Sequence, residues 1–309
     1  MAKKVYFFID DVIWTLRDLT REKPKSLFDN PFLGMLKTAH DRYGLKTQLN
    51  LFWRTDYFYG NDEFTLADVT DAYKAEWEEA SDWLKLAFHA KQEFPDYPHV
   101  NVKYEDMKAI FENIKKEVIR FAGEKSFTYG VTPHWGPVSY DGVRALYDCG
   151  VRILWCTCGD KYEYNGDPNS LPYGHAMRLL NNRQPDAGVY SRGSRDVAIN
   201  NSIACYNHLT TEQTEWMRGS FRYVVDEKTG MGFKQFGSIS ALNLIPYDEI
   251  ADELAPCLED EYLCIGNHEQ YFYSDYLAYQ PDYAEKIYKM AEIVHENGYE
   301  NFFIDELVK

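Results

Sequence analysis

Short apolar runs alternate with amphipathic stretches along most of the chain. Runs of four to nine residues, bounded by turn-forming residues, are typical of buried parallel strands, and apolar positions three and four apart are typical of helices that cover them. We expect strands over 4–9, 45–53, 84–89, 126–133, 151–158, 262–268 and 301–307, and helices over 30–44, 65–83, 104–123, 139–150 and 284–297. This alternation predicts an α/β fold with a parallel sheet or barrel and right-handed crossovers.

The alternation of strand-like and helix-like segments stops from about residue 159 to residue 248. This stretch is rich in Asn, Gly and Arg, and within it the segment 226–230 has the composition of a hairpin turn. Because strand-like runs resume afterwards, we interpret 159–248 as an elaboration within one domain that spans 1–309.

The amino-acid composition limits the kinds of binding partner that we expect for this protein. The formal charge of −16 argues against nucleic acid and against anionic membrane surfaces, since both require a basic patch. The N-terminal segment lacks the features of a secretory signal, and no apolar run approaches the roughly 20 residues of a membrane span, so we expect a cytoplasmic protein. The 25 Tyr and 7 Trp could form a platform for a flat ligand such as a sugar ring, or could simply pack.

Polar and titratable residues stand where several predicted strands end. Asp10 and Asp11 close the first strand, and His89, His134 and His268 follow later ones. In parallel α/β folds the reactive groups collect at the carboxyl ends of the strands. A divalent cation there could neutralise one Asp while the other stays free as a base.

A further candidate ligand follows the third strand. Glu93 lies four residues after His89, so the two side chains would share one metal if the intervening loop begins a helical turn. Nitrogen and oxygen ligands in this mixture suit zinc and also accept cobalt, nickel or iron.

The order of these motifs resembles the polysaccharide deacetylase family (carbohydrate esterase family four, the nodulation-type deacetylases) within the glycoside hydrolase/deacetylase superfamily. The resemblance covers roughly 4–158 and 258–309. "FIDDV" matches the family's first motif, which implies that Asp10 is the catalytic base and Asp11 a metal ligand. "HAKQE" matches the His-Ser-x-x-His motif at His89, with Glu93 in place of its second His.

Two later motifs extend the resemblance. "TPHWG" keeps Pro133, Trp135 and a glycine of the motif that lines the family's groove, with Thr132 where the family has Arg. "IGNH" fits the final Leu-x-x-His motif and implies that His268 is the general acid. The family's fold implies a distorted seven-stranded (β/α) barrel, similar to a TIM barrel, with the irregular segment and its hairpin inserted.

The resemblance implies a metal-dependent hydrolase that removes acyl groups from the amides or esters of a carbohydrate, with a divalent metal, expected to be zinc, held by Asp11, His89 and Glu93. The candidate substrate-binding residues are His134, Trp135, Trp53 and Arg54. A glycoside hydrolase on the same barrel, or a carbohydrate-binding relative without catalysis, are the alternatives.

Several of these residues also have a purely structural interpretation. The Asp10–Asp11 pair could cap the segment that follows, and His89 could be a hydrogen-bonded core residue. Glu93 could be a solvated carboxylate, and His268 could pair with the neighbouring Glu269. We place His99, in a loop bounded by prolines, at the surface.

Overall fold

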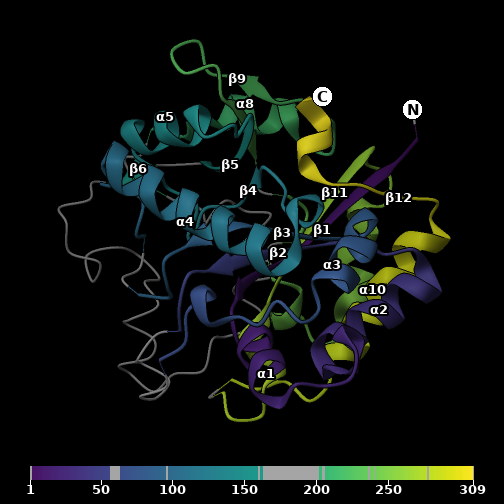
Figure 1. The fold of residues 1–309 in the computed structure, drawn as a ribbon. Coiled ribbons are helices and arrows are strands. Elements are labelled where there is room, and N and C mark those ends of the chain that lie inside the picture. Colours follow the sequence, from purple (N-terminus) through teal and green to yellow (C-terminus); the bar gives the residue numbers. More distant parts are fainter. Residues whose placement is uncertain are drawn as a thin grey trace.

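The computed structural model describes residues 2–55, 63–94, 97–158, 161–162, 202–203, 206–235, 237–239, 241–276 and 278–308. Strands and helices alternate along the chain, and the helices lie around the outside of the strands (Figure 1). The strands are β1 Lys4–Val12, β2 Thr47–Phe52, β3 Leu84–Ala90, β4 Gly130–Val131, β5 Ile153–Cys158, β6 Lys161–Tyr162, β7 Ser202–Ile203, β8 His208–Leu209, β9 Val224–Val225, β10 Gly232–Gln235, β11 Tyr262–His268 and β12 Glu300–Asn301. The α-helices are α1 Trp14–Glu22, α2 Pro31–Tyr43, α3 Lys74–Glu79, α4 Tyr104–Ala122, α5 Tyr140–Asp148, α8 Thr211–Met217, α9 Ile250–Leu254 and α10 Tyr283–Glu296.

Two sheets join into a closed ring of parallel strands. One sheet has the order β11-β1-β2-β3, and the other contains β4-β5-β10. Parallel bridges link them at both seams, from Leu86 to Phe127 and from Ile239 to Ile265. The ring β1-β2-β3-β4-β5-β10-β11 is the seven-stranded α/β barrel that the sequence predicts, and it is distorted because each seam rests on one isolated bridge, between a residue of β3 or β11 and a residue outside the strands.

Glycine makes one of these seams possible. After β10 the chain crosses close to β11, where Ser238 N–H and Ile239 N–H both donate to the carbonyl of Cys264 at 2.9 and 3.1 Å. A Cβ atom on Gly237 would overlap the Cβ of Cys264. The close approach of two backbones therefore requires a residue without a side chain.

The barrel has an interior and an exterior core. Along β1, Tyr6 and Phe8 pack in the interior with Trp155, whereas Val5 and Phe7 belong to the larger core under the helices. This period of two is the strand alternation. It places Asp10, two residues beyond Phe8, on the interior face at the end of the barrel where the strands finish.

Most predicted elements are confirmed. Helix α2 begins at Pro31 behind Asn30, whose Oδ1 accepts a hydrogen bond from Leu33 N–H at 3.1 Å, and it ends at Gly44 with φ of 69°. The predicted hairpin turn lies between β9 and β10, where Gly230 N–H donates to the carbonyl of Asp226 at 2.8 Å. Strand β10 belongs to the barrel, so the predicted elaboration 159–248 also supplies a barrel strand.

Three predicted elements are shorter than expected. The helix predicted over 65–83 is α-helical only in α3, because Arg120 binds the carbonyls of Leu66 and Val69 (2.9 and 2.8 Å), which a continuous helix would use internally. The fourth strand shrinks to β4. The last strand ends at β12, after which Glu306 accepts a hydrogen bond from Phe303 N–H at 3.0 Å at the start of a 3₁₀ turn.

Much of 159–205 lies outside the described residues, so the single-domain interpretation stays a prediction. Within the part of the chain that the structure describes, no helix combines the length and the apolar character needed to cross a bilayer.

Candidate functional site

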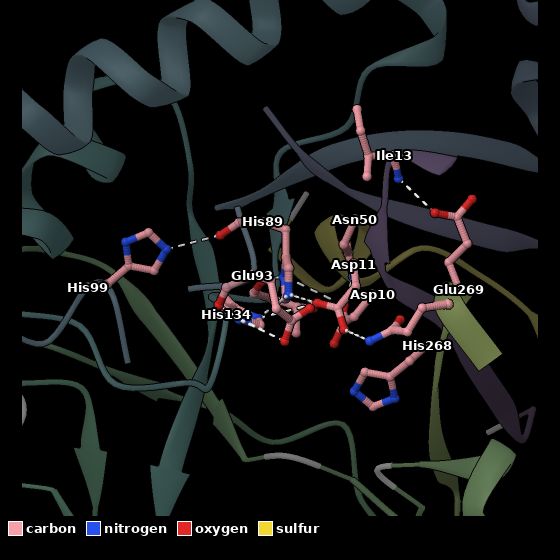
Figure 2. Close-up of polar contacts among 12 residues, drawn as sticks. Asp10, Asp11, Ile13, Asn50, His89, Glu93, His99, His134, His268 and Glu269 are labelled. Carbon is pink, nitrogen blue, oxygen red and sulfur yellow. Dashed lines mark hydrogen bonds and ion pairs between the residues drawn. The ribbon is translucent and has the colours of Figure 1, made fainter. Parts of the chain in front are cut away.

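Residues from four strand ends meet at one end of the barrel. Asp10 and Asp11 lie in β1, His89 in β3 and His268 in β11, while His134 follows β4 (Figure 2). Asp10 and His268 are direct partners in the β1–β11 register, so their side chains leave the same face of the barrel wall. The sequence prediction that these residues open onto one end is confirmed.

Backbone geometry lets two consecutive carboxylates face the same site. In a regular strand Asp10 and Asp11 would point to opposite faces. The β1–β2 register shifts between Ile9 and Val12, and Asp11 adopts φ of 65°, in the left-handed region. That conformation is costly for a residue with a Cβ, although Asp tolerates it better than most, and it concentrates at functional sites.

Three buried side chains bring their ligand atoms together. Asp11 Oδ1 lies 3.2 Å from His89 Nε2 and 3.3 Å from His134 Nδ1, and the two nitrogens are 3.0 Å apart. The side chains are 4%, 1% and 5% exposed, and Asp11 Oδ1 has no hydrogen-bond partner. Among the described residues these three form a group whose atoms all lie within 4.8 Å of one another.

Backbone carbonyls fix the tautomers of both imidazoles. The carbonyl of Thr132 lies 2.6 Å from His89 Nδ1, and the carbonyl of Glu93 lies 3.0 Å from His134 Nε2. Because a carbonyl only accepts, each of these nitrogens carries a proton, and the other nitrogen of each ring faces the group. Burial lowers the pKa of His89 to about 4, which keeps its ring neutral.

Two imidazole nitrogens and a carboxylate oxygen at these distances form a donor set that fits a divalent metal ion, and each imidazole is oriented by a carbonyl on its far nitrogen. Residues Asp11, His89 and His134 could hold it. The sequence predicts His134 as a substrate-binding residue.

Glu93 takes a different position from the one a helical turn would give it. Residues 91–93 are not helical, and the Glu93 carboxylate lies 4.0 Å from His134 Nε2, the nitrogen that faces away from the group. Glu93 is buried, so the solvated alternative is wrong. Its role as a metal ligand stays a prediction.

Asp10 is held by an amide. Asn50 Nδ2 donates to Asp10 Oδ1 at 2.6 Å. Burial, and then the neighbouring Asp11 carboxylate, raise the pKa of Asp10 well above its usual range, while the Asn50 hydrogen bond lowers it. A carboxyl group with a raised pKa is suited to accept a proton near neutral pH.

The capping alternative for the Asp pair is wrong, because Glu269 performs that task. Its carboxylate is fully buried and accepts from the backbone N–H groups of Ile13, Trp14 and Thr15 at 2.7, 2.8 and 2.7 Å, at the start of α1. Burial raises the pKa of Glu269 to about 7, against these three hydrogen bonds. Glu269 thereby fixes the turn that follows Asp11.

His268 lies beside Asp10 and is oriented by Asn243. Its Nδ1 is 3.2 Å from Asn243 Oδ1, and its carbonyl accepts from the Tyr283 hydroxyl at 2.9 Å. Burial chiefly lowers the pKa of His268, while Asp11 raises it. The other ring nitrogen, Nε2, is left to face a ligand.

Other polar residues around the site were missed by sequence reasoning. Gln270 Nε2 donates to Asp11 Oδ2 at 2.9 Å, on the oxygen opposite the histidines. His99, expected at the surface, is only 3% exposed, and its Nε2 lies 3.0 Å from the carbonyl of His89. Gln48 and Asn50 alternate with apolar residues in β2, a pattern that could have marked them as interior polar groups.

The predicted substrate-binding aromatics, Trp53 and Trp135, follow strands β2 and β4 in the chain. Trp135 has φ of 63° and packs against Tyr97, with ring centroids 4.9 Å apart. Trp53 is partly buried against the core, and Arg54 Nε donates to Gln92 Oε1 at 2.7 Å. Substrate contact by Trp53, Arg54, His134 and Trp135 stays a prediction.

No family model matches the sequence, and no curated protein matches it. Solved structures do: a 4-alpha-glucanotransferase from Thermococcus litoralis is similar over 100% of this chain and 40% of its own, with a TM-score of 0.51 and 9% identity. The chain thus spans less than half of that protein, and the likeness concerns the fold.

Two solved structures with lower TM-scores are described as CE4 proteins, the family that the motifs resemble. A CE4-family pseudoenzyme from Bacillus anthracis matches over 100% of this chain and 66% of its own, with a TM-score of 0.45 and 9% identity. The Xyl-CE4 domain of a xylanase from the hindgut metagenome of Trinervitermes trinervoides matches over 99% and 90%, with a TM-score of 0.44 and 10% identity.

Proposed function

We propose that the protein is a metal-dependent hydrolase that removes acyl groups from the amides or esters of a carbohydrate. One observation carries the proposal. Asp11, His89 and His134 direct a carboxylate oxygen and two imidazole nitrogens at one another in a buried place, an arrangement typical of a metal site. The order of the motifs in the sequence supports the acyl-transfer chemistry.

The donor set suits zinc, and also cobalt, nickel or iron. A bound divalent ion would act as a Lewis acid, polarising the acyl carbonyl and stabilising the negative charge that develops on its oxygen.

Asp10 supplies the base. Asn50 occupies Oδ1, so Oδ2 is the oxygen that accepts a proton from the attacking water. Without that proton acceptor a neutral water is a poor nucleophile toward an amide or ester carbon.

His268 supplies the acid on the neighbouring strand. Asn243 Oδ1 accepts from Nδ1, so in the imidazolium form of His268 the second proton is on Nε2, and this proton passes to the departing amine or alcohol of the sugar. Asp10 and His268 are register partners on adjacent strands, which supports a role for both at one scissile bond.

The experiment is an assay of the protein stripped with a chelator and reloaded with zinc or cobalt. Acetate release from acetylated chito- and xylo-oligosaccharides reports the proposed reaction, and new reducing ends report the glycosidase alternative. Asp10→Asn should lower turnover roughly 100-fold or more with metal retained. Asp41→Asn, an exposed carboxylate paired with Lys37, is the matched control.

Acetate release that needs the metal and Asp10 supports the proposal. Reducing ends without acetate, or sugar binding without either product, would replace it by one of the alternatives. Wild-type turnover by Asp10→Asn would make Asp10 a structural carboxylate.

A further inference from the structure

A line of two amides crosses the barrel interior and ends on Asp10. Gln48 and Asn50 lie two residues apart in β2, both fully buried. Gln48 Nε2 donates to the carbonyl of Gly130 at 3.0 Å and to Asn50 Oδ1 at 2.7 Å. Asn50 Nδ2 then donates to Asp10 Oδ1 at 2.6 Å. The line joins three barrel strands, β4, β2 and β1.

The direction of every hydrogen bond in this line is determined by its two ends. The carbonyl of Gly130 can only accept, so the group of Gln48 that faces it must be the NH₂. The same NH₂ reaches Asn50, which must therefore present its oxygen to Gln48. Its NH₂ is left for the Asp10 carboxylate, the acceptor at the other end.

We infer that Gln48 and Asn50 are positioning residues for the base, an inference that rests on the proposed function. Gln48 sets the orientation of the Asn50 amide, and Asn50 holds Asp10 Oδ1. The carboxylate is thereby turned so that Oδ2 faces the water. A neutral amide does this without the charge pairing that Lys or Arg would impose on the same oxygen.

A residue that positions Asp10 affects the rate only while Asp10 acts as the base. A residue with a merely structural role would affect the rate with or without that base. A base that is misplaced by about 1 Å loses on the order of 100-fold in rate, because proton transfer depends steeply on geometry. The effect should fall on kcat, since the hydrogen bonds of the two amides go to Gly130, to each other and to Asp10. Binding of substrate and of metal should remain.

The test measures kcat, KM and zinc affinity for Asn50→Leu, which has a similar volume and no donor. We expect kcat to fall about 10- to 100-fold, with KM and zinc affinity within about 3-fold of wild type. Gln48→Met, which frees the Asn50 amide to rotate, should lose less, about 3- to 10-fold. Thr47→Val, at the fully buried neighbouring position of β2, is the matched control and should keep kcat within about 2-fold.

The decisive comparison repeats Asn50→Leu in the Asp10→Asn background. Where no base remains to be oriented, Asn50→Leu should cost less than about 2-fold. Losses that multiply would show structural damage and overturn the inference, as would wild-type kcat in Asn50→Leu. If Asn50→Leu does not fold, the same cycle with Gln48→Met decides.

Failure of this inference is distinguishable from failure of the proposed function. If Asp10→Asn is inactive and Asn50→Leu is fully active, only the positioning role is contradicted. If Asp10→Asn is fully active, the proposed function itself is contradicted.

Discussion

Replacing His99 should reduce the loss of unfolding free energy that occurs as the pH falls. Burial lowers the pKa of His99 from 6.5 to about 3, and its Nε2 faces the carbonyl of His89. Below pH 6.5 the unfolded chain therefore binds a proton at this residue that the folded protein does not bind. The folded state loses stability as the pH falls, at about 1.36 kcal/mol per pH unit.

The magnitude follows from this window. Between about pH 7.5 and about pH 4.5 the folded ring stays neutral while the unfolded ring becomes charged, so His99 should remove about 2.7 kcal/mol from the free energy of unfolding. His99→Gln keeps an N–H donor and cannot titrate. The difference in unfolding free energy between wild type and variant should thus shift by about 2.7 kcal/mol across the window, in favour of the variant at low pH.

The assay is urea unfolding of chelator-stripped protein at a series of pH values. Other histidines contribute to both proteins and cancel in the difference. Parallel profiles for wild type and His99→Gln would instead show that His99 is accessible to protons in the folded state. His295→Gln, in the last turn of α10, is the control for the substitution itself.

Three further predictions test other parts of the structure. Glu269→Ala leaves three buried N–H groups of α1 without an acceptor, so urea unfolding should show a loss of about 2–4 kcal/mol, against less than about 0.5 for the exposed Glu285→Ala; equal losses would contradict the capping role. Gly237→Ala forces the barrel seam apart and should cost about 3 kcal/mol or more, whereas Gly44→Ala, whose added Cβ meets open space at φ of 69°, should cost about 1; a reversed order would disprove the close approach. Gln270→Leu frees Asp11 Oδ2 and should weaken zinc binding about 10- to 100-fold in a competition titration, and an unchanged affinity would show that Gln270 does not orient the ligand.

Local pattern was sufficient for much of the fold. Helix α2 carries its cap, its proline and its terminal glycine within 15 residues, and β1 and β11 are continuous apolar runs, so their positions were predictable from neighbours in the sequence. The helix over 65–83 was not, because the residue that interrupts it, Arg120, lies about 50 positions away.

Some residues of the site were likewise predictable from local sequence, and others were not. Asp10 and Asp11 stand out because two carboxylates end an apolar strand, whereas the tautomer of His134 depends on the carbonyl of Glu93, which only the folded loop brings near. From the sequence, His99 looks like an exposed loop residue. In the structure it is buried, with its ring against the backbone carbonyl of His89. Spacing alone favoured Glu93 over His134 as the partner of His89, since spacing cannot show that residues 91–93 are not helical.

Titrating chelator-stripped protein with zinc, while the bound metal is counted, shows whether Asp11, His89 and His134 hold a divalent metal. We expect one tightly bound ion in the wild type, the same in Asp41→Asn, and affinity at least about 100-fold weaker in His134→Ala. A wild type that binds no zinc or cobalt, or a His134→Ala protein that binds zinc as tightly as the wild type, would contradict this expectation.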